Sequence, residues 1–273
     1  MDVFFINLAE QAKRRKFVEN NFQAHNALGW RLHRIEAVTA QTIKDRSVPG
    51  AIRDAEKGCF LSHIDAIAES RKFDGHAFIA EDDIQFGKQS VQAIETILES
   101  VPDDAWDIVY TDILFPDMHT MIDGFLQRRR DGSKQALINL REARFCGSTA
   151  YIVNRNAKDR VLDLISQEGP IDRPYDLYLQ RLIRSDRLRA FLVFPFATTV
   201  SALGEDSQIQ TSDGQSTEFI WSSFRRLMWA ERDIGAAAEA ADRIFAAVRD
   251  DETEAFSRML AGMLAPGFKR KSV

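Results

Sequence analysis

Short apolar runs alternate with amphipathic stretches along most of the chain. The apolar runs span residues 3–8, 34–38, 76–80, 107–115, 150–153 and 189–194. Runs of this length without internal alternation are typical of strands that are buried on both faces of a parallel sheet. Between two of them, residues 58–70 place Phe60, Ile64 and Ile67 on one helical face, and Asp54 precedes this helix as its expected cap. Alternating strands and helices predict an α/β fold.

The later helices and loops are marked by their flanking residues. Asn156 with Asp159 resembles a capping box, and Pro174 suits the first turn of another helix. Residues 116–135 are polar and irregular, so we expect a loop there. Near the C-terminus the pattern becomes wholly helical. The chain therefore divides into an α/β domain, residues 1–215, and a helical extension, residues 216–273.

Charge and composition exclude several classes of protein. The 273 residues include 36 Lys and Arg against 41 Asp and Glu, a formal net charge of −5, and we exclude a nucleic-acid binder. Basic residues follow the apolar run 3–8 instead of preceding it, which favours a strand over a secretory signal. Every apolar stretch is far too short to span a membrane. With two cysteines, Cys59 and Cys146, and no export signal, we expect a cytoplasmic protein whose thiols pack in its core.

Three adjacent carboxylates, Glu81, Asp82 and Asp83, come directly after the apolar run 76–80. In open α/β sheets, ligands bind where the strands leave the core. Neighbouring carboxylates repel one another, and burial adds a desolvation cost that a divalent cation relieves. Mg²⁺ or Mn²⁺ held by one or two carboxylates and by substrate phosphates is a common arrangement. We expect a metal or nucleotide role, with a solvated turn as the alternative.

A second candidate feature is the start of the amphipathic helix. Gly58 lowers helix propensity in what we expect to be a first helical turn, which indicates that a backbone or a ligand approaches closely. Helix N-termini bind phosphate through their free N–H groups. His63 lies at the edge of the apolar stripe, where a packed, hydrogen-bonded histidine is the simpler interpretation, and Ser62 is expected on the far face.

Several short motifs occur in a consistent order over about residues 3–210. They are VFFINL with the basic residues after it, GCFLSH, AEDDI, CGSTAYIV, PIDRPYD and DSQI. Each motif is weak alone, but the set in register resembles glycosyltransferase family 25. That family includes bacterial lipopolysaccharide galactosyl- and glucosyltransferases and the collagen galactosyltransferases.

The resemblance implies a GT-A-like fold, in which a mixed sheet flanked by helices binds a nucleotide sugar. It also implies transfer of galactose or glucose from a UDP-sugar with inversion at the anomeric carbon. A bound Mn²⁺ or Mg²⁺ would neutralise the charge on the departing diphosphate. By the same resemblance, the donor would be bound by Asn7, Leu8, Ser62, His63, Glu81 and Asp82, and the metal by Glu81 and Asp83.

Inverting transfer also needs a carboxylate that takes the proton of the acceptor hydroxyl. Asp172 and Asp176 are the candidates for this base or for a further metal ligand, with Asp172 first because it precedes a predicted helix. Capping and dipole compensation at the helix N-terminus would explain both residues equally well.

The acceptor that the resemblance implies is a glycan such as the core of lipopolysaccharide or lipooligosaccharide. Arg128, Arg129 and Arg130 are most simply a solvated loop, and the alternative is contact with a phosphorylated acceptor. Basic residues at 269–271 follow an amphipathic helix and could rest on the inner membrane face.

Two other functions fit the acidic cluster. A metal-dependent phosphohydrolase would use Asp112 as its nucleophile, although Leu114 stands where a second aspartate is expected. A non-catalytic protein that binds a nucleotide sugar or a glycan could retain the same fold.

Overall fold

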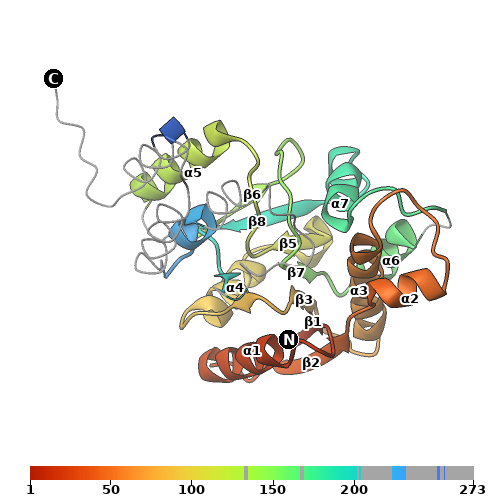
Figure 1. Ribbon diagram of the computed structural model, residues 1–273. Coiled ribbons are helices and arrows are strands. Elements are labelled where there is room, and N and C mark those ends of the chain that lie inside the picture. The colour runs from red at the N-terminus through yellow and green to blue at the C-terminus, as the bar shows by residue number, and fades with distance from the viewer. Residues whose placement is uncertain are drawn as a thin grey trace.

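A mixed sheet forms the centre of the molecule (Figure 1). The computed structural model describes residues 1–131, 135–166, 169–201, 203, 223–231, 251–252 and 255. Within these residues the sheet has seven strands in the order β2-β1-β3-β7-β5-β8-β6. They are β1 (Asp2–Asn7), β2 (Arg31–Glu36), β3 (Ala77–Glu81), β5 (Ile108–Tyr110), β6 (Ala136–Asn139), β7 (Ala150–Val153) and β8 (Ala190–Phe194). A second, two-stranded sheet pairs β4 (Ile84–Gln85) with β9 (Thr199–Val200).

The directions of the strands determine which strand ends lie at the same edge of the sheet. β1 pairs in parallel with β2 and with β3, and β5 pairs in parallel with β8. β7 lies antiparallel to both β3 and β5, and β6 lies antiparallel to β8. The carboxyl ends of β1, β2, β3, β5 and β8 therefore share an edge with the segment that leads into β7.

Helices cover both faces of the sheet, as Figure 1 shows. Phe4 of β1 belongs to a core that also contains residues of α3, α6 and α7, whereas Phe5 belongs to a core built with α1 and α4. The predicted α/β class, a mixed sheet flanked by helices, is confirmed. The helices are α1 (Ala12–His25), α2 (Ala40–Asp45), α3 (Asp54–Ser70), α4 (Ser90–Glu99), α5 (Met118–Asp131), α6 (Lys158–Ile165) and α7 (Tyr175–Arg184), with a short 3-10 helix at Asp103–Ala105.

The start of α3 differs from the sequence prediction. The helix begins at Asp54, so Asp54 lies in the first turn and does not cap it, while the Glu56 carboxylate accepts a hydrogen bond from the Arg53 N–H at 3.0 Å. Gly58 consequently lies in the second turn. A Cβ there would meet the carbonyl oxygen of Val38 at 2.4 Å, which confirms the close backbone approach expected at Gly58.

The polar segment 116–135 is not a loop, because α5 occupies most of it. Arg128 of this helix is buried, and its guanidinium donates to the carbonyl oxygens of Met228 at 2.8 Å and Ala230 at 3.1 Å. Arg128 is therefore committed to the fold and does not belong to a solvated, acceptor-binding loop. The side chain of Arg129 and the basic residues 269–271 lie outside the described residues.

The capping box predicted for α6 is also wrong. This helix begins at Lys158 with Ala157 before it, and no side chain caps it. The main-chain N–H of Asn156 instead donates to the Asn154 side chain at 2.9 Å, because the connection after β7 is a tight turn. Pro174 immediately precedes α7 and does not lie within its first turn.

The described part of the C-terminal region packs on the sheet domain. Phe224 and Met228 join the core that contains Phe4, and Trp229 forms a parallel bridge with Phe196. The rest of the predicted extension, including the DSQI motif at 206–209, lies outside the described residues. No helix within the described part is long and apolar enough to cross a membrane.

Candidate active site

A cavity of about 490 Å³ lies at the carboxyl ends of β1, β2 and β3. The segments that follow these three strands line it together with one face of α3. Leu8 comes from the end of β1, Val38 from the loop after β2, and Cys59 and His63 from α3. Glu81, Asp82 and Asp83 lie on its wall, so the structure brings the acidic motif into a hollow of the size that binds small molecules.

Asp82 holds the first strand and the first helix to the acidic motif. Its Oδ2 accepts a hydrogen bond from the Asn7 amide at 2.7 Å, and its Oδ1 forms an ion pair with Arg14 at 2.7 Å. Arg14 also donates to the carbonyl oxygen of Leu203 at 2.9 Å, and the Asn7 side-chain oxygen accepts from Arg34 at 3.0 Å. The polar groups of Asn7 and Asp82 are therefore bonded to each other, to arginines and to the Gln11 carbonyl oxygen.

One carboxylate oxygen of Asp83 lacks a hydrogen-bond partner among the described residues. Oδ1 of Asp83 is buried and has no hydrogen-bond partner in the described structure, while the main-chain carbonyl accepts from Ser201 at 2.7 Å. Burial raises the pKa of Asp83 to about 7, and the charge of Glu81 adds to the shift against the opposing charges of Arg225 and Arg14. A buried carboxylate of this kind is favourable only when a proton or a cation accompanies it.

Glu81 belongs to a different group of side chains. Its Oε1 lies 3.5 Å from Nε2 of His63 and accepts a hydrogen bond from the Ser148 hydroxyl at 3.1 Å. Burial pushes the pKa of Glu81 upward, but the hydrogen bond and charge of His63 and the Ser148 hydroxyl outweigh it, so the pKa lies below its usual value. Glu81 is therefore expected to be ionised at neutral pH.

His63 is fully buried and held in one orientation by two tyrosines. Its Nδ1 lies 3.0 Å from the hydroxyl oxygen of Tyr151, and its ring stacks on Tyr175 with centroids 4.2 Å apart. The two tyrosine hydroxyls are hydrogen-bonded to each other at 2.7 Å. This chain of contacts fixes the ring so that Nε2 faces Glu81.

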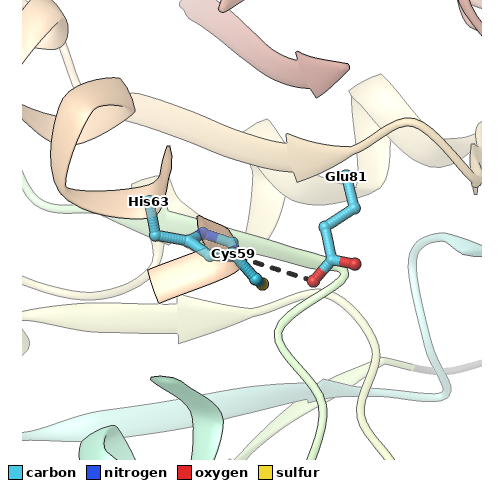
Figure 2. Close-up of side chains that lie close together, drawn as sticks. All are labelled: Cys59, His63 and Glu81. Atoms are coloured by element: carbon cyan, nitrogen blue, oxygen red, sulfur yellow. Dashed lines mark ion pairs between the residues drawn. The ribbon is translucent and has the colours of Figure 1, made fainter. Parts of the chain in front are cut away.

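Cys59 lies one helical turn before His63 and faces the same side. Figure 2 shows the two α3 side chains and Glu81 directed toward one another. The Cys59 sulfur, a ring nitrogen of His63 and a carboxylate oxygen of Glu81 all lie within 4.8 Å of one another, close enough to hold one metal ion. Burial raises the pKa of the Cys59 thiol well above its usual value, and the charges of Glu81 and Asp176 raise it further.

Ser62 and Leu8 also line the cavity. The prediction that Ser62 lies on the far face of the helix is wrong, because the loop after β2 covers it. Ser62 is fully buried, and its hydroxyl donates to the Gly58 carbonyl at 2.7 Å and accepts from the Val38 N–H at 2.8 Å. The serine thus fixes the cavity wall to α3.

The structure separates the two candidate bases. Asp172 accepts a hydrogen bond from the Ala51 N–H at 2.7 Å and lines another hollow, of about 360 Å³, bordered by residues of α3, α6 and α7. Asp176, in the first turn of α7, accepts from the Gly147 N–H at 2.8 Å. Ser148, next to Gly147, is the hydrogen-bond partner of Glu81, so Asp176 lies against the segment that borders the site, while Asp172 does not.

A buried ion pair that the sequence does not reveal lies beside the acidic motif. Asp112, just after β5, is fully buried, and Arg225 donates to its Oδ2 through Nε at 2.8 Å and through Nη2. The charge of Arg225 acts to lower the pKa of both Glu81 and Asp83, against the larger effect of burial at Asp83, so its guanidinium lies within electrostatic reach of them. Asp112 is ion-paired and does not line the cavity.

Sequence reasoning did not single out Arg14, Ser148 or Arg225 as site residues. Arg14 is one of the basic residues after the first strand, and Ser148 lies within the CGSTAYIV motif, so both stood in segments that the family resemblance uses. Arg225 gives no local signal, because its partner is 113 residues away.

The fold and this site define an α/β protein with an acidic, ligand-sized cavity at the carboxyl edge of its parallel strands. The sequence profile of glycosyltransferase family 25 (LPS biosynthesis protein) matches residues 1–178. This match covers more than half of the chain, and the chain belongs to glycosyltransferase family 25. The expected family is thereby confirmed, and the mixed sheet agrees with the GT-A-like architecture that the resemblance implies.

Two solved structures are distantly similar. One is the galactosyltransferase LgtC in complex with donor and acceptor sugar analogues, at 11% identity and a TM-score of 0.41, over 67% of this chain and 70% of that one. The other is mouse xyloside xylosyltransferase 1 in its apo form, at 11% identity and a TM-score of 0.32, over 69% of this chain and 63% of that one. No curated protein sequence matches the chain.

Proposed function

We propose that the chain transfers a hexose, galactose or glucose, from a UDP-sugar to a glycan acceptor such as the core of lipopolysaccharide, with inversion at the anomeric carbon. The observation that carries the proposal is the position of Glu81, Asp82 and Asp83 on the wall of a 490 Å³ cavity in a chain of this family. Family membership supports the transfer reaction, and the acidic cavity supports a donor that contains a diphosphate.

The donor binds in the cavity at the ends of β1–β3, where open α/β sheets bind their ligands. Leu8 and Val38 offer apolar surface for the uracil ring of the donor, and Arg14 offers a positive charge near the acidic motif. Asn7 and Asp82 hold this arrangement in place through their mutual hydrogen bond.

A divalent cation, Mg²⁺ or Mn²⁺, fits beside Asp83. The unsatisfied Oδ1 of Asp83 is a hard oxygen ligand, and such ions take one or two carboxylates together with phosphate oxygens. We propose Asp83 as the protein ligand of this hard ion, because its Oδ1 has no hydrogen-bond partner in the described structure, whereas Oε1 of Glu81 faces His63 and Ser148. The ion would supply charge neutralisation for the departing diphosphate.

Asp176 is the base that we propose for the acceptor hydroxyl. Its carboxylate lies at the N-terminus of α7 beside Gly147, and its charge acts on Cys59 in the cavity wall. Asp172 lines a separate hollow and is assigned no role in the transfer.

A panel of nucleotide sugars tests the proposal. Full-length protein with Mn²⁺ or Mg²⁺ is expected to release UDP from one UDP-hexose in the presence of a core oligosaccharide, and that donor should raise the unfolding temperature. Asp83→Ala should abolish UDP release, and Asp172→Asn should retain it. No thermal shift and no release with any UDP-sugar would contradict the proposal.

A further inference from the structure

Cys59, His63 and Glu81 form a group of side chains to which the transfer proposed above assigns no step. Cys59 and His63 are four residues apart on α3, so their side chains leave the same face of the helix one turn apart. Glu81 reaches them from the carboxyl end of β3, and the three ligand atoms lie within 4.8 Å of one another (Figure 2). A thiol, an imidazole and a carboxylate together are a ligand set for a borderline-soft transition ion and not for Mg²⁺.

The spacing of these atoms suits a tetrahedral ion. Ligand atoms about 2.0–2.3 Å from one tetrahedral centre lie roughly 3.3–3.6 Å from each other. Nε2 of His63 and Oε1 of Glu81 are already 3.5 Å apart. The sulfur of Cys59 lies within 4.8 Å of both atoms.

The surroundings of His63 resemble the outer shell of a metal site. A metal-binding histidine usually donates its other ring N–H to a fixed acceptor, which holds the lone pair toward the ion. Nδ1 of His63 has such a partner in the Tyr151 hydroxyl, itself held by Tyr175. The remaining nitrogen, Nε2, makes two long contacts, at 3.4 Å to the Ser148 hydroxyl and at 3.5 Å to Oε1 of Glu81.

We propose that Cys59, His63 and Glu81 bind a divalent transition ion of the Zn²⁺ class, with its fourth position open to the cavity. All three residues line the cavity, and three protein ligands with one open position are typical of reactive rather than structural zinc sites. Binding releases the thiol proton to solvent, so one thiolate and one carboxylate neutralise the ion. This site is separate from the hard oxygen site at Asp83.

Cobalt spectroscopy tests the site without any sugar donor. Tag-free, full-length protein is titrated with Co²⁺, and we expect a thiolate-to-cobalt charge-transfer band that saturates at one ion per chain and survives excess Mg²⁺. Cys59→Ser should abolish the band. The matched control Cys146→Ser, which removes the other cysteine, should retain it, and so should Asp83→Asn.

The absence of a band in the wild type, its persistence in Cys59→Ser, or its equal loss in Cys146→Ser would overturn the site. Alkylation gives a second readout that does not depend on spectra. Zn²⁺ should slow the modification of Cys59 by iodoacetamide and leave that of Cys146 unchanged, and equal rates at Cys59 with and without Zn²⁺ would also overturn it. Neither measurement involves sugar transfer, so both would still test the metal site if the proposed function proved wrong.

Discussion

Asp172 and Asp176 are four residues apart in the sequence, yet their carboxylates face different parts of the molecule. Asp172 is held by the Ala51 N–H outside the cavity, whereas Asp176 is held by the Gly147 N–H beside the segment that contains Ser148. A motif can nominate both residues but cannot tell them apart, because their difference arises from packing between segments distant in sequence.

Asparagine substitutions at these two positions separate a base from a structural aspartate. Asp176→Asn keeps an oxygen for the Gly147 N–H but cannot accept a proton, so kcat should fall by about 10²–10⁴-fold with KM for the donor little changed. Asp172→Asn should leave both constants close to those of the wild type. Steady-state UDP release measures both, and a larger loss in Asp172→Asn would reverse our assignment.

His76 makes the stability of the fold depend on pH. Burial lowers the pKa of His76 to about 4, and the charges of Arg155 and Lys158 act in the same direction against the charge of Asp103. The unfolded chain, with a pKa near 6.5, therefore binds the proton first as the pH falls. The stabilisation from neutral His76 is complete above pH 6.5 and is lost as the pH falls toward 4, by roughly 2–3 kcal/mol.

His76→Asn should flatten this dependence, because asparagine does not titrate and its side-chain oxygen can still accept the Arg155 N–H. The free energy of unfolding by urea at several pH values between 4 and 7 measures the effect. His119→Asn, at a side chain that is 86% exposed, is the matched control and should keep the wild-type slope. Equal slopes in all three proteins would show that His76 contributes nothing.

Among the elements, α3 is the one that fixes the cavity wall. Gly58 lets the loop after β2 pass so closely that a Cβ would lie 2.4 Å from the Val38 carbonyl oxygen. The Ser62 hydroxyl then binds the Val38 N–H from the same face of the helix. Because both contacts are made to main-chain atoms of Val38, an added side chain at residue 58 would have to displace the backbone of the loop.

Gly58→Ala is therefore expected to destabilise the protein by roughly 1–3 kcal/mol, since the clash outweighs a gain in helix propensity of about 1 kcal/mol. Donor binding should weaken as well, because the displaced loop lines the cavity. Gly75→Ala is the control: no atom lies within 4 Å of its added Cβ, so stability should be nearly unchanged. The urea midpoint decides, and equal midpoints for the two variants would contradict our account of Gly58.

The elements themselves could be predicted where burial alone shapes the sequence. The strands β1, β3, β7 and β8 are apolar because both sheet faces are covered, and their runs in the sequence agree with the structure within a residue or two. α5 could not be predicted, since its contacts with residues 228–230 depend on Arg128, a charged residue that looks solvated in sequence. β6 is an edge strand with exposed ends and carries too little apolar pattern to be seen.

At the scale of the whole molecule, the site depends on pairs that join each end of the chain to its middle. Asn7 and Arg14 bind Asp82, and Arg225 from the C-terminal region binds Asp112 next to the acidic motif. The acidic motif could be identified as a candidate site from the sequence, because three adjacent carboxylates directly after a buried strand can be recognised from neighbouring residues alone. The sequence could not predict the arginines, because their positions are set only when residues 68 to 113 apart in the chain come together.

The most direct measurement of the central claim is the structure of the product. The protein is incubated with a metal, a core oligosaccharide and the UDP-hexose that gives UDP release, and the product is examined by NMR spectroscopy. Our account predicts one new glycosidic linkage whose anomeric configuration is opposite to that of the donor. Formation of free sugar or phosphate alone, or tight UDP binding with no new linkage under any metal, would contradict it.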